Sequence, residues 1–194
     1  MKIEIDEKLG EKNKLQKWTV EIFKKVKNKL SIKDLTIEIQ KTKSNHDLVD
    51  LNGISGYCPN KNYIRLRIDS TNSNFNKKNF QLCLAHEFQH AARRRAGVKI
   101  GESTFYECLI SEGLADYFCE TLLGETPVWV KKFKANEFKK IEKKASKIYN
   151  CKMNDRLYEQ WFTKGNLTEK IPKWAGYSLG YILAKKLKNK KNEN

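Results

Sequence analysis

The chain has 194 residues, of which 39% are apolar and 11% aromatic, enough to bury the core of one ordinary domain. Its formal charge is +16, but 33 of its 39 basic residues are Lys, whereas proteins that read nucleic acids tend to use Arg. No apolar run approaches the roughly 20 residues that cross a bilayer, and the five Cys include no CxxC pair. We therefore expect a single cytosolic domain over residues 1–194, without a membrane span or a disulfide framework.

The first part of the chain predicts one helix and a small sheet. Apolar residues at close to helical spacing predict a helix over residues 11–30, and alternation predicts strands over 35–39 and 63–68. Residues 44–60 are rich in Asn, Gly and Pro, which predicts a loop or a hairpin. We expect residues 1–76 to form a helix-and-sheet part with a mostly antiparallel sheet.

The rest of the chain predicts helices. A helical pattern covers residues 77–95, and Thr104 with Glu107 forms a possible capping box at the start of the next helix. Further helices are expected over 126–148, opened by Pro127, over 154–163 and over 174–190, before a frayed tail at 188–194. The pattern predicts an α+β fold, in which the sheet packs on the helix over 77–95 and a mainly helical part over 77–190 follows.

His86-Glu87-Phe88-Gln89-His90 is an HExxH motif within the helix predicted over 77–95. Residues four apart share a helix face, so the two imidazoles can bind a single ion. Nitrogen ligands with an open coordination position suit catalytic zinc, and Glu87 can take a proton from zinc-bound water. The alternative is two surface histidines on an amphipathic helix. The apolar residues around the motif favour the metal, because burying two unpartnered imidazoles is costly.

A catalytic zinc site needs a third protein ligand. The remaining His, His46, lies in a predicted loop, and Cys83 is poorly placed to face the ion. Glu112 lies on the next predicted helix, 22 residues after His90, and Asp116 follows one turn later on the same face. Glu112 can complete the site, while Asp116 can accept the second N–H of a ligand His. The alternative is an exposed acidic pair, which the apolar neighbours disfavour.

Four short blocks of sequence within residues 50–185 carry a resemblance to a known family. They are GISGY at 53–57, AHEFQH at 85–90, EGLADYF at 112–118 and WAGYSLGY at 174–181. In this order they resemble a bacterial family of uncharacterised, predicted zinc-dependent proteases. The HExxH motif followed by a Glu on a second helix also resembles the gluzincin plan of thermolysin-like metallopeptidases. The resemblance implies a zincin-like fold, with His86, His90 and Glu112 as zinc ligands and Glu87 as the base.

The group that stabilises the oxyanion departs from the thermolysin-like pattern. Those enzymes add a separate His, and this chain has none after His90. Tyr177 is our candidate, because a phenol can donate to a developing alkoxide; a packed aromatic beside glycines is the alternative. Arg65 and Arg67 are further candidates, although the alternation of their strand directs them to solvent. That strand, 63–68, can also offer an edge to an extended peptide, or be a plain core strand.

The sequence as a whole predicts a zinc metallopeptidase that cleaves peptide or protein substrates with Glu87 as general base. One alternative is a zinc-containing regulatory or binding protein with little turnover, which the intact Glu87 disfavours because structural zinc needs no base. Another is a Lys-rich binder of nucleic acid or anionic surfaces. The scarcity of Arg and of basic–aromatic motifs argues against that alternative.

Overall fold

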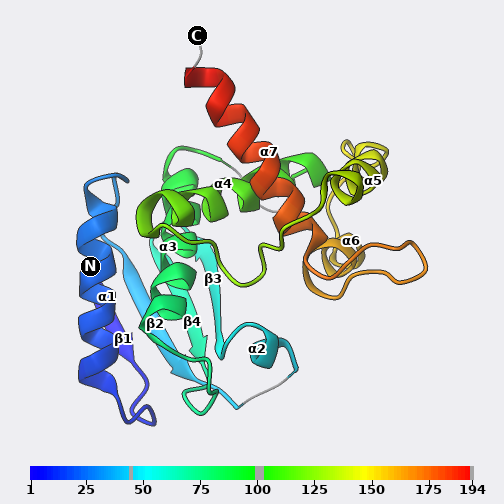
Figure 1. Cartoon of the computed structure of the whole chain (residues 1–194). Helices are drawn as coiled ribbons and strands as arrows, with labels where there is room; N and C mark the ends of the chain where they lie inside the picture. Colours follow the sequence, from blue (N-terminus) through cyan, green and yellow to red (C-terminus); the bar gives the residue numbers. More distant parts are fainter. Residues whose placement is uncertain (44–45, 99–102, 193–194) are drawn as a thin grey trace. The chain divides into compact units, whose positions relative to one another are not determined.

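The computed structural model describes residues 1–43, 46–98 and 103–192 (Figure 1). The chain divides into two compact units, one built from Met1–Val98 with Phe118–Val128 and the other from Lys99–Tyr117 with Trp129–Asn194. Helix α4 (Phe105–Leu123) contributes residues to both. Within the described residues, no helix combines the length and the apolar character that a membrane span requires. The single domain expected from the sequence stays a prediction.

The first unit contains a four-stranded sheet with the strand order β1-β2-β4-β3. Its strands are β1 (Lys2–Ile5), β2 (Thr36–Lys41), β3 (Ile54–Asn60) and β4 (Tyr63–Ile68). β1 pairs with β2 in parallel, β2 pairs with β4 in parallel, and β3 and β4 are antiparallel. The prediction of a mostly antiparallel sheet is therefore wrong. The two parallel pairs are each joined by a long connection, which parallel strands need: helix α1 (Lys12–Lys27) links β1, which the sequence did not signal, to β2, and the residues between Lys41 and Tyr63, β3 included, link β2 to β4.

Apolar side chains from the helices and strands of the first unit form its core. Helix α3 (Lys77–Arg95) packs against β3, β4 and α1, and α1 also contacts β1 (Figure 1). On β4, Ile64, Leu66 and Ile68 are fully buried, whereas Arg67 between them is exposed. This alternation gives the sheet one buried and one polar face, as the sequence predicted for residues 63–68.

The segment predicted as loop or hairpin contains more regular structure than expected. It holds a short helix, α2 (His46–Asp50), and then the whole of β3, which forms a hairpin with β4. β4 consequently lies between β2 and β3, with a strand on each side. The prediction that residues 63–68 offer an edge to a peptide is therefore wrong, and β3 is the strand at that end of the sheet.

The second unit is helical. Besides the first part of α4 it contains α5 (Ala135–Ser146), α6 (Asp155–Tyr158), the π-helical turn η1 (Glu159–Thr163) and α7 (Ala175–Asn192). Its core combines aromatic and aliphatic side chains, and the Phe105 ring centroid lies 4.9 Å from that of Trp161. The helix predicted from residue 126 begins only at Ala135, because tertiary bonds hold the preceding segment: the Lys131 backbone N–H donates to Ser178 Oγ at 2.8 Å.

Candidate metal site

Helix α3 positions the HExxH motif inside the first unit. Asn76 caps the helix, its side chain accepting the Asn79 N–H at 3.0 Å, and Arg93–Arg95 in the last turn complement the negative helix end. From Phe80 to Ala91 every residue of the helix except Gln89 is buried, since a sheet and a second helix cover it. The sequence bounds of 77–95 are confirmed.

His86 and His90 form a close, buried pair. Their side chains are 4% and 8% exposed, and the two Nε2 atoms lie 3.0 Å apart. The rings meet edge to face, at 4.6 Å between centroids and an interplanar angle of 78°. A zinc ion about 2.0–2.1 Å from each nitrogen in a tetrahedral site separates two such nitrogens by about 3.3 Å. The spacing of the pair therefore fits two ligands that face the same ion.

The Glu87 side chain is buried where α3 packs against β3. It is 6% exposed, and a Cβ added at Gly56 of β3 would lie only 2.6 Å from its Cγ and Oε1. The carboxylate therefore rests directly against the Gly56 backbone, where any side chain on β3 would displace it. The pKa of the nearby Cys58 thiol is raised to about 12, mainly by burial and secondly by the negative charge of Glu87.

Helix α4 carries Glu112 and Asp116 in the second unit. Its capping box is present as predicted, with the Thr104 N–H donating to the Glu107 carboxylate at 2.7 Å and the Glu107 N–H donating to Thr104 Oγ1 at 3.3 Å. Glu112 is half-buried, and Asp116 is completely buried. The pair is therefore not exposed on a solvated helix face, and that alternative is wrong.

Asp116 has a partner that the sequence did not suggest. The indole N–H of Trp129 donates to Asp116 Oδ1 at 2.9 Å, from a segment that was expected to be helical. A buried carboxylate needs such a donor, because burying an unpaired charge is costly. The bond from Asp116 to a ligand His stays a prediction.

Tyr177 lies on α7 within a group of aromatic rings. Its hydroxyl lies 3.0 Å from that of Tyr158, its ring centroid is 5.7 Å from that of Trp129, and it meets Phe162 edge to face at 5.2 Å. Burial raises the pKa of the Tyr177 phenol well above its usual value, and Tyr158, Glu112 and Asp116 raise it further. The Tyr177 phenol therefore keeps its proton to a higher pH than an exposed tyrosine does.

Two of the four sequence blocks meet in the second unit. A Cβ on Gly113 of EGLADYF would lie 2.0 Å from the Gly180 carbonyl oxygen, and a Cβ on Gly180 of WAGYSLGY would lie 2.2 Å from the Leu109 carbonyl oxygen. Helices α4 and α7 therefore touch backbone to backbone, which only glycine permits at these positions. This contact holds the segments of α4 and α7 that carry Glu112 and Tyr177 against each other, although the sequence blocks lie about 60 residues apart.

The described residues contain a donor set suited to a metal. Among them, His86, His90 and Glu112 make up the group of His, Cys, Asp and Glu side chains that could hold an ion. Two imidazoles and one carboxylate are a set that catalytic zinc takes, with a position left for water or substrate.

Comparison with known proteins agrees with this chemistry. A family described as predicted Zn-dependent protease matches residues 15–194, which is most of the chain. Searches among curated proteins and among solved structures find no match. The resemblance carried by the four sequence blocks is thereby confirmed, and so is zinc as the cofactor that the family name states. The chain belongs to the family of predicted Zn-dependent proteases.

Proposed function

We propose that the protein is a zincin-like zinc peptidase in which His86, His90 and Glu112 bind the ion and Glu87 is the general base. The observation that carries this proposal is the buried imidazole pair, with Nε2 atoms 3.0 Å apart, on the same helix as a buried carboxylate. A site that only held zinc for structure would need no such carboxylate, and burying it costs free energy. When bound, zinc supplies Lewis-acid polarisation of the scissile carbonyl and of a water molecule.

Glu87 moves the proton in this proposal. Its carboxylate accepts a proton from the water that attacks the scissile carbonyl, and then donates it to the leaving amine nitrogen. The Gly56 backbone, in contact with the Glu87 side chain, restricts where the carboxylate can lie. Such restriction supports catalysis, because a base acts only within hydrogen-bond reach of its proton.

The second unit contributes orientation and charge stabilisation. We assign Asp116 the role of accepting the N–H of a ligand His, with the Trp129 indole holding the carboxylate in place. Tyr177 donates to the developing oxyanion, with Tyr158 fixing its hydroxyl. The raised pKa of Tyr177 supports this role, because the donor stays protonated in the working pH range.

The substrate in this proposal is an extended peptide that pairs with β3. That strand ends the sheet, and its Gly56 touches the proposed base. Backbone hydrogen bonds to such a strand hold a peptide without regard to its sequence. The cytosol, expected from the Cys content, remains the predicted location of this activity.

Metal analysis and turnover of a small set of variants test the proposal. Wild type and Glu7→Gln, the same change at an exposed carboxylate, are expected to bind about one zinc per chain and to hydrolyse a peptide library. Glu87→Gln is expected to keep the zinc and lose at least about 100-fold in kcat, because it removes the base and no ligand. His86→Ala is expected to lose the zinc. Turnover that survives in Glu87→Gln, or zinc content undiminished in His86→Ala, contradicts the assignment.

A further inference from the structure

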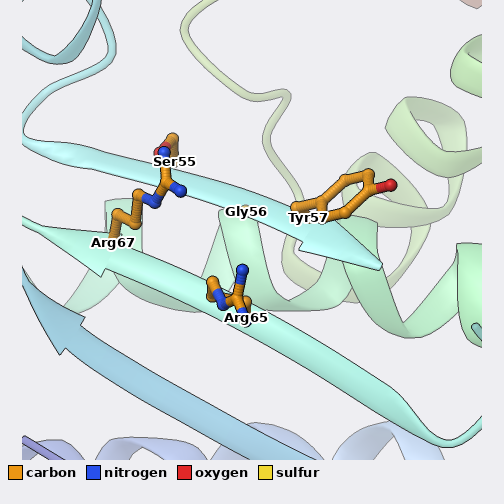
Figure 2. Close-up of a pocket in the computed structure, with 5 residues that line it drawn as sticks. All are labelled: Ser55, Gly56, Tyr57, Arg65 and Arg67. Atoms are coloured by element: carbon orange, nitrogen blue, oxygen red, sulfur yellow. The ribbon is translucent and has the colours of Figure 1, made fainter. Parts of the chain in front are cut away.

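The polar face of the sheet holds a cavity of about 170 Å³, lined by Ser55, Gly56, Tyr57, Arg65 and Arg67 (Figure 2). Ile54 and Cys58 of β3 are buried, so Ser55 and Tyr57 project from the opposite face of the strand. Ser55 pairs with Arg67 of β4, and Tyr57 pairs with Arg65. Figure 2 shows Arg67 extending from β4 toward Ser55, whose small side chain leaves it room.

The charges of the side chains that line the cavity suit one negatively charged group. Two guanidinium groups line it, and no carboxylate does. Arg65 already donates through its Nε to the Glu38 carboxylate of β2, at 2.8 Å. The charge of Arg65 is therefore neutralised from β2, on the side of β4 opposite β3. Arg67 is exposed and has no hydrogen-bond or ion-pair partner among residues 1–43, 46–98 and 103–192. A guanidinium presents paired donors that match a carboxylate, and Arg67 is available for that bond.

The cavity and the proposed base lie on opposite faces of the same three residues of β3. Gly56 contacts Glu87 on the helix side, while its neighbours Ser55 and Tyr57 line the cavity on the other side. A peptide paired with β3 directs successive side chains to alternate faces of the sheet. When one peptide residue faces Glu87, the side chains of its neighbours project over the face that carries Arg67.

We propose that this cavity binds the side-chain carboxylate of an acidic residue in the peptide substrate, next to the residue that faces Glu87. The inference rests on the proposed peptidase function and adds its substrate class: extended peptides with Asp or Glu beside the scissile bond. Arg67 is the specificity-determining residue, and Arg65 and Ser55 complete the carboxylate pocket.

A titration that observes the arginines directly tests the pocket without turnover. The chain has six Arg, so a ¹⁵N-arginine spectrum contains six Nε–H signals, which Arg65→Lys and Arg67→Lys variants assign. Two capped five-residue alanine peptides serve as probes, one with Glu and one with Gln at the centre. The Glu peptide is expected to move the Arg67 signal and to bind about tenfold more tightly than the Gln peptide, because it adds a charge-assisted hydrogen bond.

Charge variants test whether Arg67 causes the preference for the Glu peptide. Arg67→Gln is expected to abolish the tenfold preference for the Glu peptide. Arg156→Gln, the same change at an exposed position of α6, is expected to keep that preference. Arg67→Glu is expected to reverse it, so that a matching Lys peptide binds more tightly. Equal affinity of wild type for the Glu and Gln peptides overturns the inference. Acetate that binds as tightly as the Glu peptide also overturns it, because the cavity would then hold a free anion rather than a peptide side chain.

Turnover separates this inference from the function on which it rests. Wild type that cleaves Glu and Gln peptides with equal kcat/KM refutes the acidic preference and leaves the peptidase intact. Zinc-loaded protein that cleaves no peptide, yet still prefers the Glu peptide in the titration, refutes the peptidase and supports the carboxylate pocket.

Discussion

Replacing Gly56 by Ala is a direct test of where Glu87 lies. The added Cβ would be 2.6 Å from Glu87 Cγ and Oε1, whereas ordinary contact starts at 3.4 Å, so the carboxylate must move away by about 1 Å. The atoms that must move belong to the end of a flexible side chain, and Gly56 is not in the left-handed region, so the strand itself need not change. A displacement of about 1 Å at a reacting group can cost about 100-fold in rate. We expect Gly56→Ala to lose about 100-fold in kcat and to keep its zinc and its fold.

The assay compares kcat, zinc content and melting temperature for wild type, Gly56→Ala and Gly10→Ala. Gly10 is the matched control, because a Cβ added there meets no atom within 4 Å. Its variant is expected to equal wild type in all three measurements. A wild-type kcat in Gly56→Ala would refute the placement of Glu87. A melting temperature lower by more than about 10 °C in Gly56→Ala would refute it too, since the strand and not the side chain would then give way.

Three further predictions concern buried contacts. Trp129→Phe leaves the buried Asp116 carboxylate without its 2.9 Å indole donor, so the free energy of unfolding in urea should fall by about 1.5–3 kcal/mol. Gly180→Ala drives a Cβ into a backbone carbonyl of α4 at 2.2 Å, so α4 and α7 must separate, and urea unfolding should show a loss of about 3 kcal/mol or more. Cys58, with its pKa raised from 9.0 to about 12, stays neutral in the fold while the unfolded chain ionises it, so its contribution to stability is intact below pH 9 and falls as the pH rises toward 12.

Each of these predictions has a matched control. Trp18 is 8% exposed, as Trp129 is, and its indole donates to no described residue, so Trp18→Phe tests ring loss without a hydrogen bond. Equal losses in the two Trp variants would contradict the role of the indole N–H. Gly10→Ala serves as the control for Gly180→Ala, and equal stability of those two would contradict the backbone contact. For the thiol, Cys58→Ala should flatten the alkaline fall in urea midpoint, whereas Cys151→Ala at an exposed position should not.

Local sequence patterns were sufficient where one element's own residues decide its structure. The strand over 63–68 and the helix over 77–95 have the predicted bounds, because alternation and a helical pattern are properties of those segments alone. β1 was missed because four residues, Lys2–Ile5, are too few to show a period, and its pairing with β2 depends on residues far along the chain. The parallel pairing of β2 with β4 was missed although both strands were predicted, because their relative direction depends on the segment between them, β3 included.

In the candidate site, too, the features set by local sequence were predicted and the contacts between distant residues were missed. The HExxH spacing and the acidic pair on α4 are local signals, and both segments are helical as predicted. Trp129 and Tyr158 were missed, because their bonds to Asp116 and Tyr177 cross 13 and 19 residues of sequence and follow no short motif. Pro127 at a helix start is a local preference, and the bonds of the following segment override it.

The strand order also sets the order in which the sheet can assemble while the chain is being synthesised. β3 and β4 are neighbours in the chain and can close as a hairpin within about 1–10 μs. Of the four strands, β1 is synthesised first, and its partner β2 follows after residues 6–35, before β3 and β4. The β1–β2 pair can therefore form before the β3–β4 hairpin exists, and β4 then pairs with the free edge of β2. A chain that lacks β1 would leave the hydrogen-bonding edge of β2 open, and such a chain should aggregate through that edge.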